Sequence, residues 1–135
     1  MPVEQSFTEK TLNDPQLQDE YFITSDNVSL PLSSWLPSDN QPPLHTILIA
    51  LHGFNDYAQA FEYTGKYLND LCIGVYAYDH RGFGRDTSKQ LGIWAGQENL
   101  VRDVVSAMQA ARQTYPNIPI YLMGESMGGA VIINA

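Results

Sequence analysis

The chain has few basic residues and a single cysteine among its 135 residues. Seven Lys and Arg residues stand against 15 Asp and Glu residues, so the formal net charge is −8 at pH 7. This charge argues against nucleic acid or an anionic membrane surface as a main partner. Because Cys72 has no second cysteine to pair with, an internal disulfide is excluded. Its apolar neighbours, Leu71 and Ile73, indicate a small core residue rather than a reactive thiol.

Long hydrophobic stretches are also absent. The longest apolar run, Ile47–Leu51, is far shorter than the roughly 20 residues that span a bilayer. The first residues carry neither the basic stretch nor the apolar stretch of a secretory signal. We therefore expect a cytoplasmic protein without an integral membrane segment. The three histidines have no metal-ligand spacing such as HExxH, so no metal is expected.

Strand-like and helix-like segments alternate after residue 45. Short, mostly apolar runs predict strands at Thr46–Leu51, Ile73–Tyr78 and Ile118–Met123. Helices are expected between them, at about Ala58–Leu71 and Glu98–Thr114. This alternation predicts an α/β fold with flanking helices on a mostly parallel sheet, joined by right-handed crossovers.

The residues before this alternation have a different pattern. Residues 1–20 are polar and aperiodic, and we expect them to form an N-terminal arm. Two strand-like segments, Tyr21–Thr24 and Val28–Leu36, flank the turn residues Ser25–Asn27, which predicts an antiparallel hairpin. This leading hairpin should form one edge of the sheet. We therefore expect residues 21–135 to belong to a single domain, of which they form the N-terminal portion.

The most informative motif is the G-x-S-x-G pentapeptide Gly124-Glu125-Ser126-Met127-Gly128. A strand-like run precedes it and a small-residue, helix-compatible run follows it. A serine on a sharp turn between strand and helix is a nucleophile elbow, whose hydroxyl faces a cleft. We therefore expect Ser126 to be the catalytic nucleophile, with Gly124 and Gly128 allowing the turn to close. The alternative is a serine that merely caps the following helix.

A second segment, His52-Gly53-Phe54, directly follows the expected strand Thr46–Leu51. In a parallel sheet its loop should lie at the same edge as the elbow. The backbone N–H groups of Phe54 and Met127 are therefore expected to form an oxyanion hole. Gly53 would allow close approach of the backbone, and His52 should shape the loop rather than act as the base. The alternative is a simple turn at the end of a strand.

A third segment, Asp79–Gly84, follows the next expected strand and contains two glycines. It lacks the lysine and the spacing of a phosphate-binding loop. Asp79 and Arg81 are therefore expected to fix the loop rather than to act chemically.

These segments occur in an order and spacing that resemble one family. Together with Tyr115–Pro119 and the doubled glycine after the elbow, they resemble the monoacylglycerol lipase and lysophospholipase branch of the α/β-hydrolases, which is similar to serine aminopeptidase S33. The resemblance runs from about Tyr21 to Ala135. It implies a cofactor-free serine hydrolase acting on small-molecule carboxylic esters, often single-chain acyl lipids, with the nucleophile and oxyanion amides named above. One departure is Asp86, where many members carry serine.

In this fold the acid and the histidine of the catalytic triad follow the serine in the sequence. The residues after Ser126, Met127–Ala135, include neither an acidic residue nor a histidine. We therefore expect the acid and the histidine beyond residue 135 of a parent enzyme, and an inactive 135-residue chain. Two alternatives stay open: a thioesterase or acyltransferase on the same fold, and a non-catalytic fragment or pseudo-hydrolase. The oligomeric state cannot be predicted from these patterns.

Overall fold

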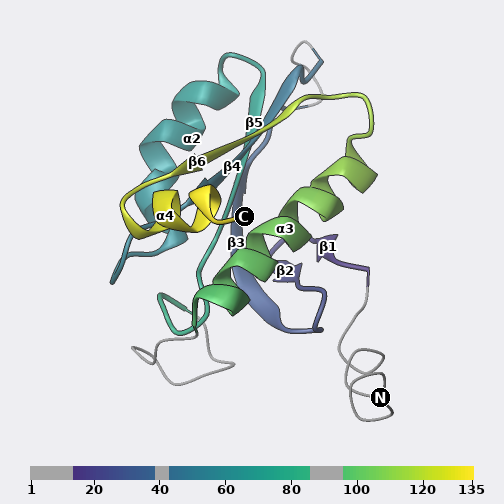
Figure 1. The fold of residues 1–135 in the computed structure, drawn as a ribbon. Coiled ribbons are helices and arrows are strands. Elements are labelled where there is room, and N and C mark those ends of the chain that lie inside the picture. The colour runs from purple at the N-terminus through teal and green to yellow at the C-terminus, as the bar shows by residue number, and fades with distance from the viewer. Residues whose placement is uncertain (1–13, 39–42, 86–95) are drawn as a thin grey trace.

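The computed structural model describes residues 14–38, 43–85 and 96–135, so most of the expected arm lies outside the described residues. The strands are β1 (Gln16–Leu17), β2 (Tyr21–Ile23), β3 (Ser29–Trp35), β4 (Thr46–Leu51), β5 (Ile73–Tyr78) and β6 (Ile120–Gly124). The helices are the 3₁₀ helix η1 (Ala58–Phe61), α2 (Glu62–Asn69), α3 (Gln97–Thr114) and α4 (Met127–Ile133), drawn in Figure 1.

The strands form one sheet in the order β1-β2-β3-β5-β4-β6. Strand β4 pairs in parallel with both β5 and β6, whereas β3 pairs antiparallel with β5. The predicted α/β class and the leading hairpin at one edge are confirmed, and the sheet as a whole is mixed. In the described part of the chain, β6 forms the opposite edge.

Strand β1 lies within the segment expected to be an arm. It adds two residues to the hairpin edge by pairing antiparallel with β2. Leu17 packs against the hydrophobic core, which gives this short segment an apolar anchor that its polar neighbours do not suggest.

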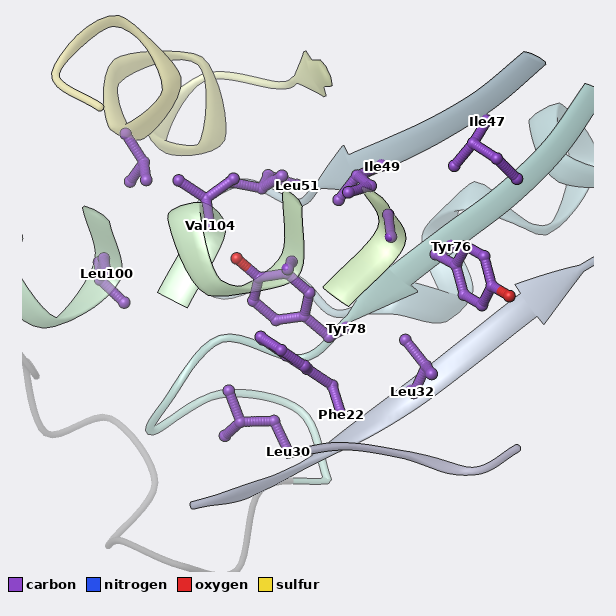
Figure 2. Close-up of a cluster of buried hydrophobic side chains, with 13 residues drawn as sticks. Phe22, Leu30, Leu32, Ile47, Ile49, Leu51, Tyr76, Tyr78, Leu100 and Val104 are labelled. Carbon is purple, nitrogen blue, oxygen red and sulfur yellow. The ribbon is translucent and has the colours of Figure 1, made fainter. Parts of the chain in front are cut away.

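Apolar side chains cover both faces of the sheet. On one face, β4 contributes Ile47, Ile49 and Leu51 to a core beneath α3 and α4. In Figure 2 the rings of Phe22 and Tyr78 lie side by side in this core, with centroids 4.8 Å apart. The opposite face of the sheet packs against η1 and α2. Burial on both faces explains why β4 is apolar almost throughout rather than alternating.

A buried arginine links three parts of the fold. Arg81 follows β5, and its Nε and Nη2 atoms donate to both carboxylate oxygens of Asp103 on α3, at 2.8 and 2.7 Å. Nη2 also forms an ion pair with Asp26 in the turn between β2 and β3. Buried charges persist only where they are paired. The expected role of Arg81 in fixing its loop is confirmed, and the same side chain fixes the hairpin to α3.

This network predicts an acid-dependent loss of stability. Burial opposes the ionisation of Asp26, but hydrogen bonds from Arg81 and Thr24, with the charge of Arg81, outweigh it and lower the Asp26 pKa from 3.8 to about 2. The ionised carboxylate therefore stabilises the fold above about pH 4, and this contribution is lost as the pH falls towards about 2. We expect Asp26→Asn to reduce the free energy of unfolding at neutral pH by about 1 to 2 kcal/mol.

Urea unfolding between about pH 2 and pH 7 measures this effect. The difference in unfolding free energy between wild type and Asp26→Asn should shrink as the pH approaches 2. Asp70→Asn, at an exposed aspartate after α2, is the matched control and should follow the wild-type profile. A constant difference across the pH range would contradict the assignment.

Candidate active site

Ser126 lies on the turn between β6 and α4, at the end of the sheet where the parallel strands finish (Figure 1). Its backbone has φ 54° and ψ −111°, in a region that residues with a side chain rarely adopt. The side chain is exposed and makes no capping hydrogen bond to α4. A capping residue has extended backbone and bonds to the helix, so the capping alternative does not describe this serine.

The two glycines of the pentapeptide are required by close backbone contacts. A Cβ atom at Gly124 would lie 2.4 Å from the backbone nitrogen of Gly129. A Cβ atom at Gly128 would lie 2.3 Å from the carbonyl oxygen of Leu51, the last residue of β4. Without side chains at these positions, α4 can turn back sharply against the end of β4.

The loop after β4 lies directly beside the elbow. The backbone N–H of Glu125 donates to the carbonyl oxygen of Leu51 at 3.0 Å. A Cβ atom at Gly53 would lie 3.5 Å from the Cβ of Ser126. The structure thus brings together the two segments that the sequence places at the ends of neighbouring parallel strands, because β4 and β6 are paired in register up to Leu51 and Gly124.

Phe54 and Met127 carry the two backbone amides expected to bind an oxyanion. Phe54 sits in a tight turn in which the N–H of Asp56 donates to the carbonyl oxygen of Gly53 at 3.2 Å. Its side chain is 58% exposed. Met127 is the first residue of α4, and amides in a first helical turn have no carbonyl of their own helix to bind.

His52, the first residue of this loop, is fully buried. Its Nε2 accepts the backbone N–H of His80 at 3.0 Å, so the ring proton lies on Nδ1 and is donated to the carbonyl oxygen of Gly53 at 2.7 Å. Burial lowers the His52 pKa, which favours this neutral form. Because both ring nitrogens are engaged, His52 is not placed to take a proton from Ser126.

The other two histidines are no better placed. Burial lowers the pKa of His80 to about 3, so it does not accept a proton near neutral pH. The ring of His45 bonds to the hydroxyl of Thr46, at the start of β4, and to the carbonyl of Leu71. It therefore lies at the opposite end of β4 from the elbow.

The Asp79 carboxylate accepts hydrogen bonds from two separate segments of the chain. Its Oδ1 accepts the backbone N–H of Ala58, the first residue of η1, at 2.7 Å. Its Oδ2 accepts the backbone N–H of Arg85 at 2.8 Å. The expected loop-fixing role is confirmed, and the carboxylate also anchors the far end of the loop that begins at His52. Asp86, where the motif departs from many relatives, lies outside the described residues.

Other features of the surface lie away from the elbow. A cavity of about 510 Å³ opens beside β3, lined among others by Ser33, Trp35, Glu62 and Arg85. None of its lining residues belongs to the elbow or to the loop after β4. Among the described residues there is no cluster of three or more metal-ligating side chains, and none of their helices is long and apolar enough to cross a membrane.

Comparison with known proteins places this geometry in a family. Residues 42–135 match the family model of serine aminopeptidase, S33. The chain is 27% identical over 133 residues to the monoglyceride lipase of Homo sapiens, an alignment that covers 98% of this chain and 43% of that protein.

Solved structures show the same fold. A soluble variant of monoglyceride lipase from Saccharomyces cerevisiae, in complex with a substrate analog, superposes with a TM-score of 0.71 and 20% identity, over 93% of this chain and 40% of that chain. A thioesterase domain from the curacin biosynthetic pathway superposes with a TM-score of 0.65 and 20% identity, over 88% of this chain and 40% of that one.

The sheet order, the flanking helices and these structural neighbours define the chain as part of an α/β-hydrolase fold. Within that class it belongs to the serine aminopeptidase S33 family, and the resemblance to the monoacylglycerol lipases is confirmed. The chain spans less than half the length of these relatives.

The elbow geometry predicts that alanine substitutions at two neighbouring glycines differ strongly in their effect on stability. We expect Gly128→Ala to lower the free energy of unfolding by about 1 to 3 kcal/mol, because the new methyl group would overlap the Leu51 carbonyl. Gly129→Ala is the matched control, since its Cβ would have its nearest contact at 3.5 Å. Alanine in a helix should leave stability unchanged or raise it there. Equal urea unfolding curves for the two variants would contradict this account of the elbow.

Proposed function

We propose that Ser126 is the nucleophile of a serine hydrolase that cleaves carboxylic esters, with single-chain acyl lipids such as monoacylglycerols as substrates. The observation that carries the proposal is an exposed serine, with a positive φ and no capping bond, beside Gly53 at the end of the parallel strands. The monoglyceride lipases to which the chain is similar support the substrate class.

In the proposed reaction, the Ser126 Oγ attacks the ester carbonyl carbon while a base takes the hydroxyl proton. The carbonyl oxygen becomes an oxyanion that accepts hydrogen bonds from the N–H groups of Phe54 and Met127. Collapse of this intermediate breaks the bond to the alcohol, which leaves with the proton, and an acyl-enzyme remains. Water then releases the carboxylic acid by the same steps and restores the serine.

The proposed base is not one of the histidines in this chain. His52 has both ring nitrogens engaged, His80 has a pKa of about 3, and His45 lies at the other end of β4. We place the acid and the histidine of the triad after residue 135, as expected from the order of the triad in this fold.

A related proposal keeps the site and changes the substrate. Thioester hydrolysis or acyl transfer would use the same serine and the same two amides. The observation that supports this second candidate is the structural similarity to a thioesterase domain. The two functions differ only in the leaving group and in what receives the acyl group.

The test of the main proposal is Ser126→Ala in the full-length protein, with hydrolysis of a p-nitrophenyl ester as the readout. Loss of the nucleophile should lower kcat by at least about 1,000-fold. Ser29→Ala, at an exposed serine on β3, is the matched control and should keep wild-type activity. Undiminished turnover by Ser126→Ala would refute the proposal.

The 135-residue chain by itself should react slowly with a fluorophosphonate probe. A serine hydroxyl without a base within hydrogen-bond reach is a poor nucleophile at neutral pH. Labelling is measured by intact-mass spectrometry, with Ser126→Ala as the control for reaction at other residues. Rapid, stoichiometric labelling of Ser126 would show that a base is supplied to the isolated chain, and would overturn this expectation.

A further inference from the structure

The loop that contains Phe54 packs against a second loop along its length. We call residues 52–58 the oxyanion loop and residues 79–85 the supporting loop. At one end, the N–H of His80 donates to His52 Nε2 at 3.0 Å. At the other end, the N–H of Ala58 donates to Asp79 at 2.7 Å. Between them, the rings of Phe54 and Phe83 meet edge to face, with centroids 5.3 Å apart and planes inclined by 72°.

The contact between the rings of Phe54 and Phe83 is the one made by Phe54 itself. The two hydrogen bonds fix the ends of the oxyanion loop, but Phe54 lies between them, in a turn where Asn55 has φ 60°. The Phe54 side chain is 58% exposed, whereas Phe83 is only 4% exposed. Phe83 therefore offers a fixed surface to a residue that is otherwise largely surrounded by solvent.

Phe83 is well placed to act as such a support because its own position is determined from several sides. Its N–H donates to the carbonyl of His80 at 3.0 Å, and its ring also meets that of His52, with centroids 5.8 Å apart. Arg81, two residues earlier, is held by its ion pairs. Gly84 has φ 58°, and a Cβ there would lie 2.6 Å from an Asp79 carboxylate oxygen.

We propose that Phe83 is a positioning residue for the oxyanion hole: its contact with the Phe54 ring holds the Phe54 amide in the direction that the reaction requires. This proposal rests on the proposed function, and Phe83 acts through Phe54 without touching the substrate. An amide aimed at an oxyanion acts on charge that develops during the reaction, so its displacement lowers kcat more than it raises KM.

The test uses Phe83→Leu, Phe54→Leu and the double variant in the full-length protein. Displacing a reacting group by an ångström can cost about 100-fold, and we expect kcat of Phe83→Leu to fall by about tenfold or more, with KM within about twofold. Because both substitutions break the same contact, the double variant should lose about as much as the worse single variant. A Phe83→Leu kcat within about twofold of wild type, or losses that multiply in the double variant, would overturn the proposal.

Two controls separate positioning from general destabilisation. Phe22→Leu makes the same substitution at a fully buried ring on β2, which β3 and β5 separate from β4 in the sheet, and should lower stability but keep kcat. Phe83→Tyr keeps the ring and should keep most of kcat. Equal kcat losses in Phe22→Leu and Phe83→Leu would overturn the proposal. If Phe83→Leu does not fold, Phe54→Leu breaks the same contact from its exposed side.

Ser126→Ala in the same assay distinguishes the two proposals. If Ser126→Ala keeps its activity, the proposed function itself has failed. If Ser126→Ala is inactive while Phe83→Leu keeps the wild-type kcat, the hydrolase proposal stands and the positioning role of Phe83 is wrong.

Discussion

The candidate site depends on the close contact between the elbow and the end of β4. The Glu125 amide bonds to the Leu51 carbonyl at 3.0 Å, and a Cβ at Gly128 would fall 2.3 Å from that same oxygen. The Leu51 carbonyl oxygen of β4 is thus contacted by residues on both sides of Ser126. Since the loop with Gly53 begins just after this carbonyl, any shift of the elbow relative to β4 would also separate Ser126 from that loop.

The supporting loop connects the candidate site to the rest of the fold. Arg81 connects it to α3 and to the hairpin through buried ion pairs, and Asp79 connects it to the start of η1. Removing one partner of a buried pair leaves an uncompensated charge, so such links resist small displacements. Through the supporting loop, the oxyanion loop is therefore connected to α3, to the hairpin and to the start of η1.

Much of this arrangement could be predicted from the sequence, because periodicity and short motifs are local properties. The strand Thr46–Leu51 and the G-x-S-x-G turn fix two ends of parallel strands, which is enough to bring Gly53 near Ser126. The contacts of Phe83 and Asp79 could not be predicted in the same way. These contacts join loops, which have no periodicity. Phe83 lies 29 residues after its partner Phe54, and Asp79 lies 21 residues after its partner Ala58. Strand β1 could not be predicted for a similar reason. Its partner strand β2 and the core that contacts Leu17 are brought together only when the hairpin folds.

The backbone of Ser126 gives a physical reason to assign a chemical role to its side chain. A non-glycine residue at a positive φ costs on the order of 1 to 3 kcal/mol, and glycine would relieve this strain. The hydroxyl does not offset this strain by capping α4, because it makes no hydrogen bond to the helix. Nor is it buried in a polar network, since the side chain is exposed. A strained, exposed serine between two required glycines therefore contributes little to stability, which supports the role proposed above for its hydroxyl.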